Sequence, residues 1–258
     1  MDFTLTTSLL TLGLFVGMLV LLEFGRRVSA ARAREEGEAA RAGTSALDGA
    51  VFALMGLLIA FTFSGASARF EARRQLIVEE ANAIGTAWLR IDLLPSEARP
   101  ALRERFRAYL DSRIEARRLL SDPPAFWREL ERSAGLQREI WGYAVASTRE
   151  SGSREATILL LPALNQMIDI TTTQIHTARY HPPLIIFGMV FLLALVSSLL
   201  AGYGLPSHGR SRWAHMVGFA ALVSVAVYVI LDLEYPRLGL IRLDEADQVL
   251  VDLRESMG

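Results

Sequence analysis

Residues 59–80 read IAFTFSGASARFEARRQLIVEE, and this stretch decides how the chain is organised. Its first half, up to Ala68, contains no Asp, Glu or Arg, whereas its second half begins at Arg69 and is rich in charge. No proline, Asx turn or helix cap separates the two halves. The stretch therefore predicts one continuous helix that leaves a membrane and enters an aqueous domain.

Four stretches of the chain share the composition of that first half. Each lacks Asp, Glu and Arg and has about 20 residues, enough for a helix to cross roughly 30 Å of hydrocarbon. They are residues 3–22, 49–68, 184–205 and 213–231. The first resembles a secretory signal, but its length, its uncharged amino end and the Arg residues that follow it favour a retained membrane helix.

The four spans form two pairs, and a short basic linker joins the members of each pair. Residues 1–68 hold the first pair and residues 182–231 the second, which predicts two transmembrane hairpins. Residues 69–181, between the hairpins, contain no stretch apolar enough to span, so we expect an extramembrane domain there. Residues 232–258 follow the last span and are predicted to form an interfacial tail.

Apolar residues in the middle region recur at helical spacing, as Ile77, Ile84, Trp88 and Ile91 illustrate. Proline and glycine residues divide the region into four predicted helices, at about residues 66–93, 97–120, 124–150 and 153–180. Together with the spans, they predict an all-α integral membrane protein with two transmembrane hairpins that flank a helical extramembrane domain.

The composition of the chain argues against several classes of function. The net charge is −1 with acidic and basic residues intermixed, which is not the basic surface that binds nucleic acid. The chain has no cysteine and no lysine, and no glycine-rich phosphate loop is present. Asp169, His176 and His181 are too few and poorly spaced for a metal centre, so we interpret the histidines as solvated or helix-capping. We expect no enzymatic activity and no cofactor.

Small residues within the spans are spaced for close helix packing. Gly13 and Gly17 lie one turn apart in the first span, and Gly56 and Ala60 do so in the second. Such spacing lets helix backbones approach each other in lipid. The pattern predicts helix contacts here, either within the chain or with another chain.

Two further motifs lie at span ends. The sequence AGYGLP, residues 201–206, contains the Gly-Tyr-Gly of potassium filters, but its place at the end of a complete span favours an interfacial Tyr between flexible glycines. In the tail, Asp232, Pro236 and Gly239 predict a sharp turn that anchors the last segment on the membrane or on the middle domain. We favour this structural role over ligand binding.

The stretch LLIAFTFSGASARFEARRQLIVEEANAIGTAW, residues 57–88, resembles the second membrane helix of bacterial bestrophins. The residues that carry the match are Gly56, Phe63, Ala66, Ser67, Arg69, Glu71, Ala72 and Arg73. Nearly the whole chain resembles the bacterial bestrophin-like family, including EANAIGTAWLRIDLLP at 80–95 and LDLEYPRLGLIRL at 231–243. Because all 27 basic residues are Arg, a bias we attribute to a GC-rich genome, we expect the bacterial inner membrane.

The resemblance implies a homo-oligomer that conducts small inorganic ions through a central pore lined by the second helix. It places the neck at Ile59 and Phe63, with Phe61 as the rival one face over. The other candidate pore residues are Thr62, Ser64 and Ser67. Ser67 stands where a large apolar neck residue is expected, which is a departure from the bestrophin pattern. The rival hypothesis is a non-conducting membrane scaffold or sensor whose helical domain binds a partner.

The sidedness of the middle domain stays open between two arguments. Both short linkers are rich in Arg, so the positive-inside rule places them in the cytoplasm and the middle domain outside. True bestrophins hold their middle domain in the cytoplasm, so the resemblance implies the opposite orientation. We expect membrane lipid and other copies of the chain as partners, and no nucleic acid.

Overall fold

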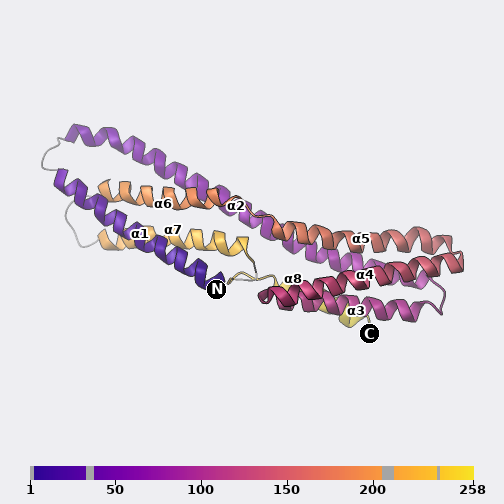
Figure 1. The fold of residues 1–258 in the computed structure, drawn as a ribbon. Helices are drawn as coiled ribbons and strands as arrows, with labels where there is room; N and C mark the ends of the chain where they lie inside the picture. Colours follow the sequence, from indigo (N-terminus) through magenta and orange to yellow (C-terminus); the bar gives the residue numbers. More distant parts are fainter. Residues whose placement is uncertain (1–2, 33–37, 205–211, 237–238) are drawn as a thin grey trace. The chain divides into compact units, whose positions relative to one another are not determined.

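The structure is a computed structural model, and it describes residues 3–32, 38–204, 212–236 and 239–258. These residues form eight α-helices and two short 3₁₀-helices, and no strand occurs among them (Figure 1). The predicted all-helical class is therefore confirmed for the described part of the chain. The helices belong to two compact units, one of Met1–Phe70 with His181–Ile241, the other of Glu71–Tyr180 with Arg242–Gly258.

Among the described residues, four helices are long and apolar enough to cross a membrane, and their apolar parts lie in the first unit. They are α1 (Phe3–Arg32), the first part of α2 (Glu38–Arg90), α6 (Leu184–Gly204) and α7 (Arg212–Glu234). Helices α1 and α2 both extend into the predicted linker, residues 23–48, because most of its residues are good helix formers. Helix α2 is unbroken through residues 59–80, as the sequence predicts.

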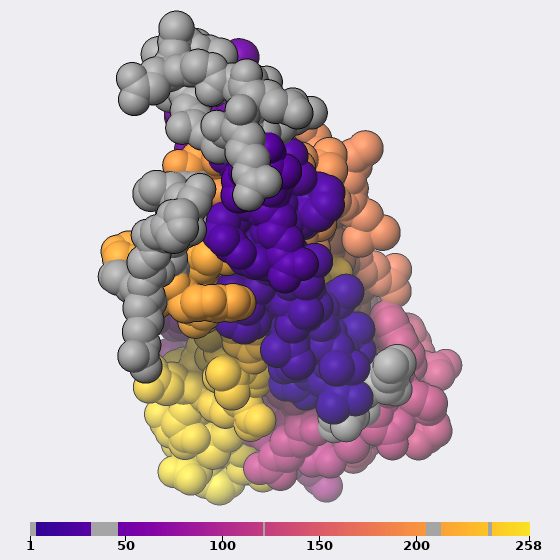
Figure 2. Space-filling view, turned by 90° about the vertical axis from the view of Figure 1, so that its left-hand side faces the viewer, coloured from indigo at the N-terminus to yellow at the C-terminus, as the bar shows by residue number. Residues whose placement is uncertain are grey.

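Helix α1 packs against both α6 and α7 in the first unit (Figure 1). The buried apolar cluster between these helices and α2, which contributes Met55, is Leu14, Met18, Leu22, Met55, Val190, Ala194, Met216, Ala220, Val223 and Val227. The other face of α1 exposes large apolar side chains such as Leu9, Val16 and Val20, and Figure 2 shows α1 (indigo) at the surface. Lipid is the surrounding that suits this face.

Two glycines bring the backbones of α1 and α6 into contact. A Cβ atom at Gly202 would overlap the Leu22 carbonyl, and a Cβ at Gly25 would overlap the Leu199 carbonyl. Only glycine lets two helices approach so closely. Gly202 is the first glycine of the Gly-Tyr-Gly motif, so its place in the structure is a helix crossing.

The second unit is a helical bundle with a core of large side chains. Besides residues 71–90 of α2, its helices are η1 (Ile91–Leu93), α3 (Arg99–Arg118), η2 (Leu119–Ser121), α4 (Pro123–Ser151), α5 (Arg154–Arg179) and α8 (Asp244–Ser256). Helix α4 packs between α3 and α5, and α8 packs on α3. The Asp122 and Ser153 side chains cap α4 and α5 by accepting hydrogen bonds from Ala125 N and Ala156 N.

A buried ionic cluster joins four helices of the second unit. The Glu80 carboxylate is fully buried, and it accepts hydrogen bonds from Arg113 Nε at 2.5 Å and from Arg117 Nη2. Gln174 Nε2 also donates to Glu80, at 2.9 Å, and Arg117 Nη1 pairs with Asp247 of α8 at 2.8 Å. Burial raises the pKa of Glu80, but the two guanidinium groups outweigh it and lower the pKa to about 2.

The predicted tail, residues 232–258, is divided between the two units. Residues up to Ile241 belong to the first unit, and Arg242–Gly258 belong to the second. Two further contacts hold α8 against α3, since Arg254 Nε donates to Asp111 at 2.7 Å and Arg107 Nη2 donates to the Met257 carbonyl at 2.8 Å.

We predict that Glu80→Gln lowers the free energy of unfolding of the second unit by about 3 kcal/mol, because two buried guanidinium groups lose their anion. Thermal unfolding in detergent, followed by Trp fluorescence, measures this change, since Trp88, Trp127 and Trp141 lie in this unit. Glu79→Gln is the control, because Glu79 is the exposed neighbour. Equal stability of the two variants contradicts the prediction.

We also predict that the effect of Glu80→Gln depends on pH. The pKa of Glu80 is about 2 in the folded protein against its usual 4.5, so its stabilising effect is complete above pH 4.5. The effect is lost as the pH falls from 4.5 toward 2, because the unfolded chain binds the proton more tightly. The difference in melting temperature between wild type and variant narrows over this range. A constant difference contradicts the assignment.

Candidate functional site

Helix α2 is the least covered of the apolar helices. Only 6% of its most apolar 18-residue stretch is buried within the chain, compared with 44% of the corresponding stretch of α7. It contacts the rest of the first unit along one side, where Phe52 packs edge-on against Phe219 and Met55 and Ala66 are buried. The remaining faces of α2 are open, so this helix offers the largest surface to lipid, to water or to another chain.

The predicted pore residues lie on different sides of α2. Phe61, Phe63, Ser64 and Ser67 are exposed, with Phe61 at 67% and Phe63 at 45%. Ile59 is half-buried against the apolar core of the first unit. Within one chain, therefore, the side chain of Phe63 is available to a pore, and the side chain of Ile59 contacts its own chain.

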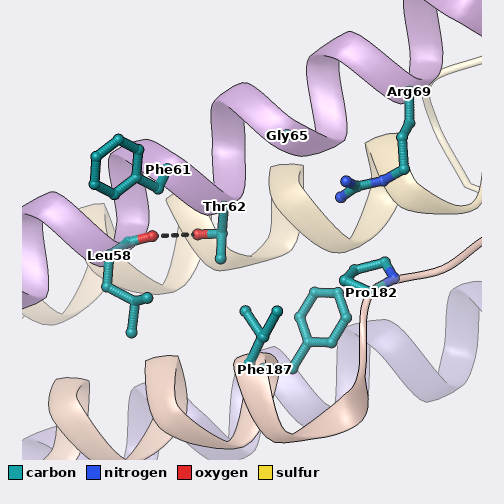
Figure 3. A pocket seen from close by; sticks show the side chains of 8 residues that line it. Leu58, Phe61, Thr62, Gly65, Arg69, Pro182 and Phe187 are labelled. Carbon is teal, nitrogen blue, oxygen red and sulfur yellow. Dashed lines mark hydrogen bonds between the residues drawn. The ribbon is translucent and has the colours of Figure 1, made fainter.

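Thr62 differs from the two serines in its hydrogen bonding. Its hydroxyl donates to the Leu58 carbonyl at 2.6 Å, so the side chain is satisfied by its own helix (Figure 3). Ser64 and Ser67 are exposed and lie three residues apart, which places them on neighbouring faces of the helix. They are the exposed hydroxyl groups among the predicted pore residues.

At Arg69, where α2 acquires charge, an ionic cluster closes the first unit. Arg69 Nη2 pairs with Glu234 Oε2 at 2.7 Å, and Arg69 Nε lies 2.9 Å from the same oxygen. His181 Nδ1 lies 3.0 Å from Glu234 Oε1, and the His181 ring stacks on Tyr235. The carboxylate of Glu234 is fully buried. The cluster thus joins α2, the segment before α6 and the end of α7.

No local sequence pattern reveals the cluster of Arg69, His181 and Glu234, because these three residues lie far apart along the chain. His181, predicted to be solvated or to cap a helix, instead bonds to Glu234. Within the described ranges, no group of three or more His, Cys, Asp or Glu side chains is placed to hold a metal ion.

Two residues of the tail motif meet in a closed turn. The buried carboxylate of Asp232 accepts hydrogen bonds from Leu240 N at 3.1 Å and Ile241 N at 2.8 Å. Gly239 lies against that carboxylate, and a Cβ there would overlap Asp232 Oδ1. Pro236 lies in the turn between them and is half-buried. Residue 239 must therefore be glycine, because the Asp232 carboxylate leaves no space for a Cβ atom there.

The predicted packing residues have different surroundings within the chain. Gly17 faces Leu195 of α6, whose Cδ2 atom would lie 3.2 Å from a Cβ. No atom lies within 4 Å of a Cβ at Gly13 or Gly56, and Ala60 is exposed. Of these four residues, Gly17 packs within the chain, and the other three have open surfaces.

A cavity of about 230 Å³ lies between α2 and the start of α6 (Figure 3). Its walls are apolar except at Thr62 and Arg69. The lining residues are Leu58, Phe61, Thr62, Gly65, Arg69, Pro182, Ile186 and Phe187.

Four of the described helices are long and apolar enough to cross a membrane, which is the composition of the helical membrane protein class. The family model described as the Bestrophin-like domain matches residues 12–247, so the chain belongs to the bestrophin-like family. This match confirms the resemblance seen in the sequence. Family and helices together point to an integral membrane protein. No curated protein and no solved structure matches the chain.

We predict that Gly239→Ala destabilises the first unit by about 2 kcal/mol, because the new methyl group collides with the Asp232 carboxylate. The melting temperature of the purified chain measures the loss. Gly188→Ala is the matched control, because nothing lies within 4 Å of a Cβ at Gly188.

A double-mutant cycle separates this collision from a general effect. Asp232→Ala removes the acceptor of two backbone N–H groups and is destabilising by itself. In the double variant the collision is absent, so the combined loss is smaller than the sum of the single losses. Additive losses would show that the two residues act independently.

Proposed function

We propose that the chain assembles into a homo-oligomer in the bacterial inner membrane and carries a passive ion pathway lined by α2. The observation that carries this proposal is the open surface of α2, since only 6% of its most apolar 18-residue stretch is buried within the chain. A single copy leaves this helix without protein neighbours on most of its circumference. Membership of the bestrophin-like family supports the proposal further.

The chemistry of the open surface suits a passive pathway. Residues 49–68 carry no Asp, Glu or Arg, so no ionisable group is available for proton-coupled transport. The exposed ring of Phe63 provides an apolar constriction, which can gate a pore by excluding water. Ser67 lies one turn away and provides a hydroxyl group on the same face. Small inorganic ions are the proposed cargo.

The small residues on α2 supply contacts between copies in this proposal. Gly56 and Ala60 have open surroundings within one chain and lie one turn apart. Helices that meet at such residues can approach closely in lipid. At 3.6 residues per turn, Gly56 and Ala60 lie on the same face of α2 as Phe63 and Ser67. In this proposal one face of α2 therefore meets the neighbouring copies at Gly56 and Ala60 and lines the pathway at Phe63 and Ser67.

The second candidate is a non-conducting scaffold or sensor whose second unit binds a partner. The observation that favours it is the set of large apolar side chains exposed on that unit, which includes Leu89, Trp127 and Ile158. Such side chains in an aqueous domain mark surfaces for protein contact. A monomer or dimer in detergent favours this candidate, and a ring of four or more copies favours the pathway.

We predict that Phe63→Ala raises ion flux through reconstituted protein several-fold, because it widens the constriction. The measurement is chloride, potassium and sodium flux into liposomes under varied voltage, pH and calcium. Phe24→Ala is the matched control, since Phe24 is an exposed Phe on α1, and it is expected to leave flux unchanged. Wild-type flux no greater than that of empty liposomes contradicts conduction. Flux unaffected by Phe63→Ala places the pathway elsewhere.

A further inference from the structure

We propose that the cavity between α2 and α6 holds an acyl chain of an anionic membrane phospholipid, whose phosphate binds Arg69. The proposal rests on membrane insertion of these two helices and is independent of ion conduction. Three observations carry it, namely the apolar walls, the orientation of the Arg69 guanidinium and the order of apolar and charged residues along α2.

The walls of the cavity suit a hydrocarbon chain. Leu58 and Phe61 come from α2, Ile186 and Phe187 come from α6, and the cavity has about 230 Å³ (Figure 3). Thr62 is the polar residue between them, and its hydroxyl already donates to the Leu58 carbonyl. A water molecule in this part of the cavity finds too few hydrogen-bond partners. An acyl chain makes favourable contact with all of these side chains.

Arg69 gives the cavity a positive end. Its Nε and Nη2 atoms bond to Glu234, whereas its Nη1 atom lies over Gly65, 3.2 Å from the position of a Cβ there. Gly65 itself lines the cavity, so the side of the guanidinium that carries Nη1 borders it. Among the described lining residues, Arg69 carries the one charge. Arginine with N–H groups to spare is a strong phosphate ligand.

The glycine at 65 is what leaves room for this arrangement. The Arg69 side chain folds back along its own helix over Gly65, and a larger residue there would occupy the same space. Glu234 is fully buried and does not line the cavity, so its carboxylate is not presented to a phosphate there.

The order of residues along α2 matches the order of groups in a phospholipid. Arg69 is the first charged residue after the charge-free residues 49–68, so it lies at the depth of the headgroups. Leu58 lies roughly 16 Å further along the helix, at 1.5 Å per residue, within the hydrocarbon region. A phosphate at Arg69 therefore directs an acyl chain toward Leu58.

The test uses the full chain, reconstituted in phosphatidylcholine with a trace of phosphatidylglycerol that carries a photoreactive diazirine on an acyl chain. After irradiation, mass spectrometry of peptides locates the lipid adducts. We expect adducts around Phe61 and around Ile186. The same diazirine on phosphatidylcholine should label these peptides about fivefold less, since one arginine near the surface favours an anionic headgroup by that factor.

Gly65→Leu fills the cavity and is expected to abolish the labelling. Gly218→Leu is the matched control, because it makes the same change on another apolar helix, α7, where nothing lies within 4 Å of a Cβ. Ile186→Trp fills the cavity from the side of α6, so the test does not depend on one variant. All three variants retain Arg69. Gly65→Leu also displaces the Arg69 guanidinium, whereas Ile186→Trp leaves residue 65 and the Arg69–Glu234 ion pair unchanged.

Three results would overturn the proposal. The first is equal labelling by the two headgroups, and the second is unchanged labelling in both filled variants. The third is labelling of the cavity peptides no stronger than that of the exposed face of α1 around Val16, which would also be the outcome if a second copy covers the cavity. Ion flux plays no part in the readout, so failure here is distinct from failure of the ion pathway.

Discussion

The ion pair between Arg69 and Glu234 lies where the charge-free stretch of α2, residues 49–68, ends and charged residues begin. A carboxylate buried as fully as that of Glu234 is costly unless cations and hydrogen bonds surround it. Arg69 comes from α2, Glu234 from the end of α7, and His181 from the segment before α6. The pairing therefore sets the register of three helices at this end of the unit, and the Asp232 turn follows directly along the chain.

The second unit uses the same chemistry for another purpose. Glu80 is buried between Arg113 and Arg117, and Arg117 continues the cluster to Asp247 on α8. In both units a buried glutamate on one helix is neutralised by arginines from elsewhere in the chain. Arginine suits this role, because its planar group can bond to two partners at once and keeps its charge when buried. Glu80 and Arg69 both lie on α2, so this helix contributes to both clusters.

Patterns local in sequence were sufficient to predict the helices. Prolines and caps place the starts of α3, α4 and α5 within a few residues of those predicted, and the charge-free stretches coincide with the apolar helices. The extension of α2 back to Glu38 was not predicted, since the charged linker resembles a connection between helices.

Contacts between distant residues account for what sequence could not reveal. Arg69 and Glu234 are 165 positions apart, and nothing in either local sequence indicates the other. The contact of Gly202 with Leu22 was likewise hidden, because a glycine at a span end also suits a flexible turn. In the proposed oligomer the surroundings of Phe63 and Ser67 depend on other copies of the chain, so neither the sequence nor a single chain defines them.

In the proposed assembly, α2 is the helix that faces both the other copies and the ion pathway. An electron microscopy map of the purified chain in a lipid nanodisc tests this most directly. We expect a closed ring of copies in which α2 is the span nearest the symmetry axis, with Phe63 and Ser67 directed toward that axis. A map of single copies, or a ring with α2 on its outer, lipid-facing side, would contradict it.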